Sequence, residues 1–430
     1  MPYAKPLRAS AALALITALA ATGCSTTSDG SDGDAGSKRL TYWSMWTQTE
    51  PQAQALKKSI AAFTKKTGIK VDVQWQGREV LDKLGPAMLS GKAPDLVDQS
   101  FDRLLPVLAA NGKAEDLSPV LSMDVDGGKK VSEVIPQKYL DVLPRGKDGT
   151  PWMMPYEAIS VSIFYNGKDP LVTAPPKTWD ELLAICKAAK AKGKACIGTD
   201  ADQGWATQYW FDYLLNRNGG SLEALSSDKT GAAFKNPVVL KAAQQAEDLV
   251  KNGYLIKGYD ATKYPEQQGR WVTGKSVFFL MGSWLPSEVQ KLKPAGYEFK
   301  SVTFPTTVDA TKNATDILPI GFSIPKGSKN AKAAQKFIAF FLNKDQLSGI
   351  STIAKNVTPR PDVAAPAELQ DVAAQLRDTS LRLPGENADT DWQTKVLSTT
   401  FSKLWLGKIS AKDFVTQGAK ASADYWKAKG

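Results

Sequence analysis

The 430-residue chain contains no histidine, so its candidates for acid–base chemistry are carboxylates. This composition excludes Ser-His-Asp and Cys-His catalysis, and it removes the commonest zinc ligand. Two carboxylates stand at notable positions: Asp102 follows a predicted strand, and Glu157 lies between two strand patterns. Such a pair could provide the acid and base of a glycosidase, and the separation of the two carboxyl groups decides this.

A second group of candidate residues is aromatic. Trp284 follows the apolar strand pattern SVFFLM, and Gly282 before it would let a ligand approach the backbone closely. An exposed indole offers the flat apolar face on which sugar rings stack, whereas a position in the core would give Trp284 no such role. Trp205 and Tyr209 lie one helical turn apart, so they either line a cleft together or pack on a sheet.

Polar residues follow the first three predicted strands, Leu40–Trp43, Ile69–Trp75 and Leu96–Asp98. Helical patterns alternate with these strands, which predicts a parallel sheet covered by helices on both faces. Ligands of such sheets bind beyond the carboxyl ends of the strands. The candidates at these ends are Trp46, Gln76, Gln99, Ser100, Asp102 and Arg103. Asp102 and Arg103 form either a polar clamp on a ligand or a surface charge pair at the start of a helix.

The stretch Pro151–Asn166 contains two short strand patterns with a break between them. The first ends at Pro155, which cannot donate to a sheet, and the second alternates apolar residues with serine over Ile159–Tyr165. Tyr156–Ala158 lies between them. We interpret the stretch as a hinge at which the chain passes from one domain to another; the alternative is an ordinary hairpin in one sheet.

Residues Gly269–Ser276 match the phosphate-loop pattern GxxxxGK followed by Ser or Thr. A phosphate loop must follow a strand and open a helix, so that backbone N–H groups surround the phosphate. Here a predicted helix precedes the motif and the predicted strand Ser276–Met281 follows it. Because the order is reversed, we interpret the match as accidental.

The amino-terminal segment is predicted to be a targeting signal. Lys5 and Arg8 precede an apolar run that is too short to span a bilayer. Small residues then lead to Cys24 and resemble a bacterial lipobox, although Ala21 stands where that motif usually has leucine. We predict cleavage after residue 23, a lipid on Cys24 that anchors the protein to the outer face of the cytoplasmic membrane, and a flexible linker over residues 24–38. The alternative is a soluble secreted protein that is cut elsewhere.

The formal net charge is +10, and it falls to +8 without residues 1–23, which contain two basic and no acidic residues. A basic protein can bind nucleic acid or an acidic ligand. The lysines are scattered over predicted helical faces without a dense basic run. This distribution favours a solvated surface and predicts no nucleic-acid partner.

Two cysteines remain beside the predicted lipidation site, Cys186 on a predicted helix and Cys196 at the start of the next strand. The predicted compartment is oxidising, so the pair can form a disulfide that joins the helix to the strand. Two buried free thiols are the alternative.

Several stretches, taken together and in order, resemble the extracellular solute-binding proteins of ABC importers, family 1, the maltose-binding-protein-like group. Together they extend over nearly the whole mature chain. These stretches are FTKKTGIKVDV (63–73), GKAPDLV (91–97), PYEAISVSIFYN (155–166), PPKTWDELL (175–183), VTGKSVFFLMGSW (272–284), IPKGSKNAKAAQKFIAFFL (324–342) and LWLGKISAKDFV (404–415).

The resemblance implies an α/β fold like that of type II periplasmic binding proteins, with two α/β lobes, hinge crossings between them and a helical carboxyl-terminal tail. The crossings would lie near residues 155–159, 302–305 and 343–348. The lobe boundaries that follow are 39–155 plus 303–344 for lobe 1 and 160–300 plus 348–430 for lobe 2. A ligand would bind in the cleft between the lobes and cause them to close.

The resemblance also implies which residues contact the ligand. Gln99 stands where the maltose-binding protein has an aromatic residue, a departure from the maltodextrin-binding pattern. The implied contacts in this chain are Gln99, Ser100, Asp102 and Arg103 after the third strand, Glu157 at the hinge, Trp205 or Tyr209 on a helix, Trp284, and Trp392 late in the chain.

These observations predict a protein that is not an enzyme and delivers a sugar, an oligosaccharide, to the transmembrane subunits of an ABC permease. We expect a monomer with no cofactor and no metal site, held at the membrane by its lipid. One alternative is a secreted glycoside hydrolase. Another is a binding protein for a polyamine, iron or an anion, although iron sites of this superfamily use tyrosine clusters and this chain has no adjacent Tyr-Tyr pair.

Overall fold

The computed structural model describes residues 38–307, 313–385 and 388–430. The predicted signal peptide, the predicted lipidation site Cys24 and nearly all of the predicted linker lie outside these residues. Within the described ranges, no helix combines the length and the apolar character needed to cross a bilayer.

The first part of the chain forms the parallel sheet that its alternating pattern predicted, and we call this part the first lobe. Its elements are β1 (Arg39–Ser44), α1 (Pro51–Thr67), β2 (Lys70–Trp75), α2 (Val80–Leu89), β3 (Leu96–Ser100), α3 (Phe101–Val107), α4 (Ser118–Leu121), β4 (Asp124–Val125), β5 (Lys129–Lys130), α5 (Val131–Val134) and α6 (Gln137–Asp141). β1 pairs in parallel with β2 on one side and β3 on the other. α1 ends at Gly68, whose φ of 74° is the left-handed conformation that glycine adopts readily.

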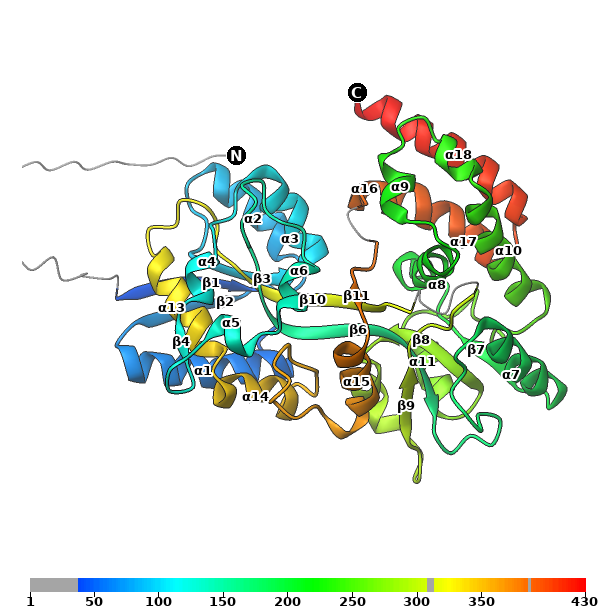
Figure 1. Cartoon of the computed structure of the whole chain (residues 1–430), viewed down its shortest axis with the longest axis horizontal. Helices are drawn as coiled ribbons and strands as arrows, with labels where there is room; N and C mark the ends of the chain where they lie inside the picture. The colour runs from blue at the N-terminus through cyan, green and yellow to red at the C-terminus, as the bar shows by residue number, and fades with distance from the viewer. Residues whose placement is uncertain (1–37, 308–312, 386–387) are drawn as a thin grey trace, which may run out of the picture. The chain divides into compact units, whose positions relative to one another are not determined.

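The predicted hinge stretch is one continuous strand, β6 (Met154–Asn166), and not two strands with a break. It pairs antiparallel with β10 (Thr315–Ser323) and with β8 (Ser276–Gly282), so the hairpin alternative is also wrong. Pro155 fits into the strand because the register with β10 shifts between Ile320 and Gly321, next to the proline. Figure 1 shows β6 and β10 running side by side through the middle of the sheet.

The chain between β6 and β10 forms the second lobe. Its remaining elements are α7 (Trp179–Ala191), β7 (Ala195–Gly198), α8 (Gly204–Arg217), α9 (Leu222–Ser227), α10 (Pro237–Lys251), α11 (Glu266–Val272), α12 (Leu285–Val289) and β9 (Phe299–Val302). β7 pairs in parallel with β8, and β9 pairs antiparallel with β6. The resulting sheet has the order β2-β1-β3-β10-β6-β8-β7, with β9 beside β6 and β11 (Leu381–Arg382) beside β10.

The second and third crossings differ from the expectation. After β9 the chain stays in the second lobe, because Thr306 pairs with Thr178 and Phe304 belongs to the second hydrophobic core. The second crossing is therefore β10 itself and not residues 302–305. The assignment of all residues from 303 to the first lobe is wrong for the same reason.

The third crossing follows α14 instead of preceding it. The elements after β10 are α13 (Ala331–Phe341), α14 (Lys344–Thr352), α15 (Gln370–Asp378), α16 (Thr390–Trp392), α17 (Thr399–Trp405) and α18 (Ala411–Lys429). α14 packs on α1 so closely that a Cβ at Gly349 would lie 3.1 Å from Ala55. α15 packs beside β9, where Asp371 accepts a hydrogen bond from the Ser301 N–H at 3.0 Å. The prediction of a crossing near residues 343–348 is thus wrong. The third crossing lies between α14 and α15.

The tail was expected to be all helical, but it contributes strand β11 to the sheet. β11 places Arg382 beside β10, where its Nε lies 2.6 Å from Asp316 and its terminal nitrogen 3.1 Å from Asp212 of α8. All three side chains are buried. This pairing joins the tail, β10 and α8 at the second-lobe end of the crossing.

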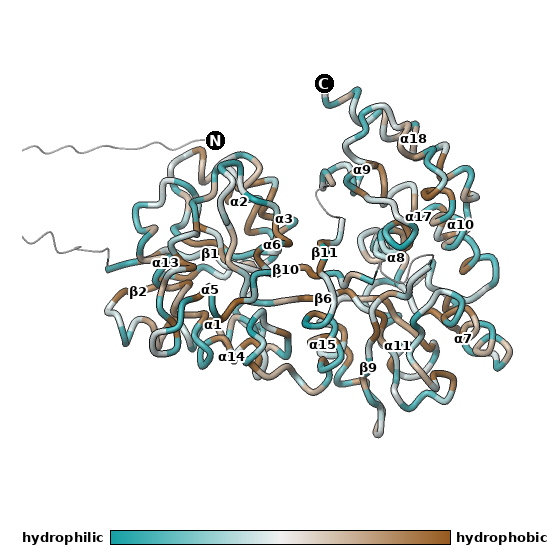
Figure 2. The backbone as a smooth tube through the Cα atoms, viewed as in Figure 1, coloured by the Kyte–Doolittle hydropathy of each residue, from teal (hydrophilic) through white to brown (hydrophobic). Residues whose placement is uncertain are grey.

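Two hydrophobic cores pack on the sheet, and β6 belongs to both. The first core extends from the first lobe to second-lobe residues such as Phe279 and Phe299, and the second core lies within the second lobe and the tail. Tyr156 and Ile159 belong to the first core, and Val161 and Ile163 to the second. Helices cover the strands with one apolar face each. In α10, for example, the buried residues recur about every three or four positions, the period of one helical face. Figure 2 shows hydrophobic and hydrophilic residues interspersed along such helices.

The structure contains the disulfide between Cys186 of α7 and Cys196 of β7, with a Cα–Cα distance of 4.8 Å. Both residues are buried in the second core. A disulfide stabilises chiefly by restricting the unfolded chain, and for a loop this short the expected contribution is about 3 kcal/mol.

We expect the double substitution Cys186→Ala, Cys196→Ala to lower the free energy of unfolding by about 2–3 kcal/mol, measured by urea denaturation at neutral pH. Reduction of the wild-type protein should lower its stability toward that of the variant. Equal stability of the oxidised protein and the variant would show that the bond contributes nothing.

Candidate functional site

The first-lobe residues of the site follow the carboxyl ends of β1, β2 and β3. Trp46 was predicted to contact ligand, but it is buried and its Nε1 donates to the Tyr156 hydroxyl at 2.8 Å. That hydroxyl donates in turn to Asp98 at 2.6 Å. The Arg78 guanidinium lies 4.7 Å from the centre of the Trp46 ring. Trp46 therefore connects β1 to β6. Arg78, which follows β2, lies over the Trp46 ring beyond the carboxyl ends of these strands.

The other first-lobe candidates differ in their access to solvent. Gln99 and Ser100 are both buried, and the Gln99 side-chain oxygen accepts a hydrogen bond from the Ser100 N–H at 2.9 Å. Both residues therefore belong largely to the packed interior of the first lobe. Arg103 is exposed, and Gln76 accepts a hydrogen bond from Lys83 at 2.6 Å. Asp102 is half-buried, and its Oδ1 has no hydrogen-bond partner among the described residues. Asp102 therefore stays a candidate for contact with a ligand hydroxyl.

Four aromatic side chains of the second lobe meet beyond the carboxyl ends of β7 and β8, and we call them the aromatic cluster: Trp205, Tyr209, Tyr264 and Trp284. The Trp205 ring centre lies 5.9 Å from Tyr209, 5.6 Å from Tyr264 and 6.2 Å from Trp284, the spacing of packed aromatic rings. Trp205 is 39% exposed, which is unusual for tryptophan and leaves an indole available to a ligand. The predicted residues Trp205, Tyr209 and Trp284 are therefore brought together.

Gly282 is required by the cluster itself. A Cβ at this position would collide with the Trp284 ring, which lies on the glycine backbone. The glycine was expected to let a ligand approach, and the structure shows that it lets Trp284 fold back over the end of β8. Trp284 Nε1 then donates to the Tyr264 hydroxyl at 3.3 Å.

Carboxylates and amides surround the aromatic rings. The Tyr264 hydroxyl donates to Glu288 at 2.8 Å, and burial followed by the Glu288 charge raises the pKa of Tyr264. Glu288 keeps access to solvent, yet desolvation by the surrounding chain raises its pKa. Nearby, Asp200 follows β7 and accepts from the Gln267 N–H at 3.1 Å, and burial raises its pKa to about 6.

Several buried polar atoms of this region have no hydrogen-bond partner of good geometry within the described residues. They are Asp200 Oδ2, Gln267 Oε1 and both side-chain polar atoms of Gln268. An unpaired buried polar group costs about 1–3 kcal/mol, so these atoms favour a bound molecule rich in hydrogen-bonding groups. Tyr264, Glu288 and Gln268 were missed by the sequence analysis, because none of them lies in a recognisable motif.

The two lobes contribute to one site. Asp102 of the first lobe lies close enough to Tyr209 of the second to raise the pKa of that phenol further, after burial. Arg78 similarly opposes the rise in the pKa of Glu288. The groups after β2 and β3 thus lie opposite those after β7 and β8, which makes the site an interlobe one.

Glu157 lies in the crossing strand and is completely buried. Its Oε1 accepts hydrogen bonds from Gln52 at 3.4 Å and from Asn356, and its Oε2 has no partner among the described residues. Burial raises the pKa of Glu157 to about 8, although these two amides and Arg78 act in the opposite direction. Glu157 is therefore protonated at neutral pH and holds the crossing strand to α1 and to the segment after α14.

Trp392 was predicted to contact ligand, and this prediction is wrong. The side chain is 0% exposed, lies in the second core and donates from Nε1 to Ser422 at 2.9 Å. Its ring contacts Phe234 at 6.0 Å between centres. Its role is to attach α18 to the body of the second lobe.

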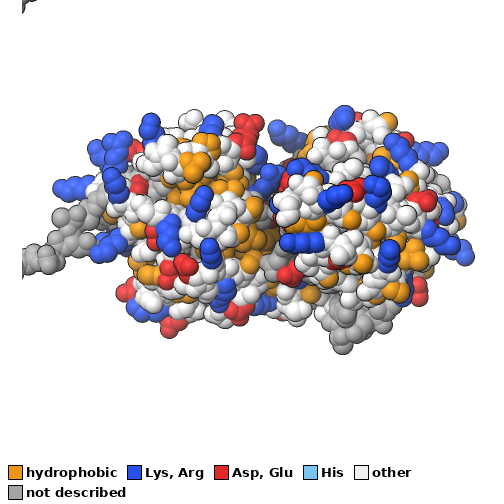
Figure 3. Space-filling model, turned by 90° about the horizontal axis from the view of Figure 1, so that it is seen from above, with side chains coloured by type: hydrophobic (Ala, Val, Ile, Leu, Met, Phe, Trp, Pro, Cys, Tyr) orange, Lys and Arg blue, Asp and Glu red, His pale blue; other side chains and the backbone are white. Residues whose placement is uncertain are grey.

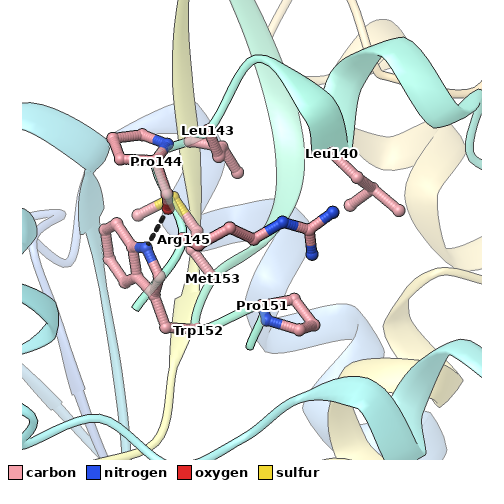
Figure 4. Close-up of a pocket in the computed structure, with 7 residues that line it drawn as sticks. All are labelled: Leu140, Leu143, Pro144, Arg145, Pro151, Trp152 and Met153. Atoms are coloured by element: carbon pink, nitrogen blue, oxygen red, sulfur yellow. Dashed lines mark hydrogen bonds between the residues drawn. The ribbon is translucent and has the colours of Figure 1, made fainter. Parts of the chain in front are cut away.

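The phosphate-loop pattern and a small crevice in the first lobe do not form ligand sites. The motif Gly269–Ser276 runs from α11 into β8, the reverse of a phosphate loop, as the sequence indicated. The crevice of Figure 4 has a volume of about 10 Å³, enough for one water molecule, and Trp152 Nε1 donates to the Pro144 carbonyl across it at 2.7 Å. Within the described ranges, no three His, Cys, Asp or Glu side chains could hold a metal ion together.

The basic side chains are dispersed over the face shown in Figure 3, with acidic groups between them. This agrees with the scattered lysines of the sequence. Many of the described lysines also have acidic partners, such as Lys168 with Glu298 at 3.1 Å and Lys251 with Glu247 at 2.8 Å.

With this fold and site in view, comparison with protein families gives a direct assignment. The chain matches the family of bacterial extracellular solute-binding proteins over residues 58–376, and it belongs to that family.

Relatives of known description are more distant. The diacetylchitobiose binding protein NgcE of Streptomyces coelicolor is 23% identical over 312 residues, which cover 68% of this chain and 65% of that protein, a little under two thirds of its length. A maltooligosaccharide ABC transporter solute-binding lipoprotein of Streptococcus pneumoniae is 24% identical over 353 residues, 80% of this chain and 78% of the relative.

Solved structures share the fold. A cyclo/maltodextrin-binding protein complexed with maltotetraose has a TM-score of 0.73 at 20% identity and covers 92% of this chain and 98% of its own. The binding protein RafE in complex with raffinose has a TM-score of 0.70 at 19% identity and covers 90% and 99%. The fold is therefore that of type II periplasmic binding proteins, as expected from the sequence.

The buried Glu157 makes stability depend on pH. Its folded pKa of about 8 lies above the value of about 4.3 in an unfolded chain, so between these values the folded protein retains a proton that the unfolded chain has lost. Stability is thus fully present below pH about 4.3 and falls as pH rises toward 8. Glu157→Gln copies the protonated side chain. We expect its free energy of unfolding to exceed that of the wild type by at least about 1 kcal/mol at pH 8 and to match it near pH 4.5.

Urea denaturation at three pH values measures this effect. The exposed Glu79 is the matched control, and Glu79→Gln should follow the wild-type profile. Parallel profiles of Glu157→Gln and the wild type would contradict the assignment of a neutral Glu157.

Proposed function

We propose that this protein is the sugar-binding lipoprotein of an ABC importer, which captures an oligosaccharide between its lobes and delivers it to the transmembrane subunits of the permease. The family assignment provides the general role of solute binding. The names of the relatives support a carbohydrate and an importer, since they include a diacetylchitobiose binding protein and a maltooligosaccharide ABC transporter lipoprotein.

The observation that carries the proposal is the aromatic cluster with its ring of polar groups. Trp205 exposes an indole face, and carboxylates and amides with unused hydrogen-bonding capacity lie beside it. The apolar C–H face of a sugar ring can stack on the indole. Its hydroxyl groups can donate hydrogen bonds to carboxylates such as Asp102 and Glu288.

The acidic groups also favour a neutral sugar. Glu288, Asp102 and Asp200 lie around the aromatic rings, and burial raises the pKa of both Glu288 and Asp200. A uronate would add another negative charge to this environment, whereas neutral hydroxyl groups can donate to the carboxylates.

Binding would favour the closed arrangement of the lobes, because a sugar that contacts both Asp102 and the aromatic cluster interacts more strongly when these groups are close. The chain would act as a monomer without cofactor or metal. The lipid on Cys24 would anchor it to the outer face of the cytoplasmic membrane, a proposal supported by the lipoprotein relative.

The glycoside hydrolase is the weaker alternative. It would need two carboxylates that reach the scissile bond, and of the pair considered from the sequence only Asp102 has access to the site. Glu157 is buried and hydrogen-bonded to Gln52 and Asn356. We therefore expect the bound sugar to remain intact.

The mature protein should bind at least one neutral oligosaccharide, with maltotetraose, raffinose and diacetylchitobiose as first probes. A specific rise in melting temperature identifies a ligand, calorimetry gives its affinity, and chromatography of the mixture shows whether it remains intact. Consumption of the sugar would support the hydrolase, and failure of every neutral sugar would contradict the proposed cargo.

For a sugar that binds, we expect Trp284→Ala to weaken affinity at least tenfold because the aromatic cluster loses a ring and its support for Tyr264. Trp426 is a suitable control, since it is a partly exposed tryptophan of α18 beside Tyr425 and Lys429. Trp426→Ala should bind normally. Unchanged affinity of Trp284→Ala by calorimetry would contradict the proposal that the aromatic cluster binds the sugar.

A further inference from the structure

A second hollow lies on the second lobe at the opposite end of β8, and we call it the rear pocket. Ser276 begins β8 at this pocket, while the aromatic cluster follows the other end of the strand, about 20 Å away. The pocket has a volume of about 270 Å³. Its walls are the segments that follow β6, precede β7, precede β8 and precede β9, so it lies within one lobe.

Two buried hydroxyl groups in the wall have no hydrogen-bond partner among the described residues: Ser276 Oγ and the Tyr297 hydroxyl. Ser276 is 2% exposed and Tyr297 9%. The Tyr297 ring is held by Phe299 and Trp271, with ring centres 4.9 Å and 5.8 Å away, so its hydroxyl has a fixed position. An unpaired buried hydroxyl is costly, and a polar occupant of the pocket would relieve this cost.

The charges at the pocket are balanced. Lys194 Nζ lies 2.5 Å from Asp169, and Lys168 Nζ lies 3.1 Å from Glu298. Burial, and then the Asp169 charge, raise the pKa of Tyr297, so the phenol keeps its proton and can donate it in a hydrogen bond. Because each ammonium group already has a carboxylate, the pocket suits a neutral molecule better than an ion.

The phosphate-loop pattern borders this pocket, but its backbone is already used. The Gly274 N–H donates to the Trp271 carbonyl at 2.8 Å, and the Lys275 N–H donates to the Arg270 carbonyl at 3.0 Å. These N–H groups are therefore not available to cradle a phosphate, which needs several of them together.

The size and lining of the pocket limit the ligand further. Its volume corresponds to about nine water molecules, below the range of about 300–1,000 Å³ for sites of drug-sized ligands. Trp271, Val277 and Pro294 provide apolar wall between the polar groups. A single sugar ring combines this size with hydroxyl groups and apolar C–H groups.

We propose that the rear pocket binds a neutral, polyhydroxylated molecule of about the size of one sugar ring, independently of the interlobe site. Tyr297 and Ser276 would hydrogen-bond its hydroxyl groups, and Lys194 would donate to a further oxygen. The protein would thus hold a small sugar or polyol on the second lobe in addition to the cargo between its lobes.

The test uses the mature protein with Trp284→Ala, which weakens the interlobe site. Saturation-transfer NMR titrations with D-glucose, D-galactose and glycerol, and a parallel titration with inorganic phosphate, measure binding at millimolar concentrations. We expect at least one neutral probe to bind saturably and phosphate not to bind. Adding Tyr297→Phe and Ser276→Ala to this variant should lower the affinity for the neutral probe about tenfold, because two hydrogen bonds are lost.

Tyr297→Phe alone should not lower the melting temperature and should raise it slightly, since the hydroxyl that it removes is buried without a partner in the ligand-free protein. In an otherwise wild-type protein it should also leave oligosaccharide affinity unchanged, which separates this proposal from the proposed transport function. The proposal is overturned if no neutral probe binds saturably, if the double substitution does not weaken binding, or if phosphate is preferred.

Discussion

The antiparallel pairing of β6 with β10 is the constraint on which the rest of the structure depends. β6 contributes residues to both hydrophobic cores, and β10 contributes Ile317, Ile320 and Phe322 to the first, so the paired strands stabilise both lobes. Polar groups can enter such a strand only if they are paired. Tyr156 meets this requirement through Asp98 and Trp46. Glu157 meets it in part, because its Oε1 accepts from two amides while burial raises its pKa and keeps the carboxyl group neutral. The connection between the lobes is therefore a buried, hydrogen-bonded part of the core and not a loose linker.

The interlobe site follows from where this pair of strands directs the other elements. Because β1, β2 and β3 are parallel in one lobe and β7 and β8 are parallel in the other, their carboxyl ends bring loops to the same region. The second lobe presents mainly rings and acids, and the first lobe presents Asp102 and Arg78. Under the proposed function, a hydroxyl-rich ligand between the lobes would satisfy polar atoms that lack partners in the ligand-free protein, and affinity would then depend on lobe closure.

Local patterns in the sequence predicted most of the elements, because strands such as Ser276–Gly282 and caps such as Thr178 and Gly68 depend on neighbouring residues. They also identified Trp205, Tyr209 and Trp284, which follow parallel strands. Tyr264 and Glu288 could not be found in this way, since they reach the site only through folding of α11 and α12 against each other. Trp392 and Trp46 were misassigned because an aromatic residue near a strand end has the same sequence pattern whether it faces a cleft or a core. The crossing at 302–305 was wrong because Thr306 pairs with Thr178, and the crossing at 343–348 was wrong because α14 packs on α1. Both contacts join residues far apart in the sequence, which no local pattern records.

The buried pairing of Arg382 with Asp212 and Asp316 has a mechanical consequence. It clamps the start of β10 to α8, while Phe322, packed against Tyr156 and Phe341 at 4.6 Å and 5.4 Å, fixes the other end of the strand in the first core. Between these two attachments lies the span Ile317–Gly321, which pairs with β6 and, at Ile320 and Gly321, also with β3. Pro319 further restricts one of its dihedral angles. Any relative movement of the lobes must therefore bend these five residues together with β6, and the paired backbone resists a wide opening.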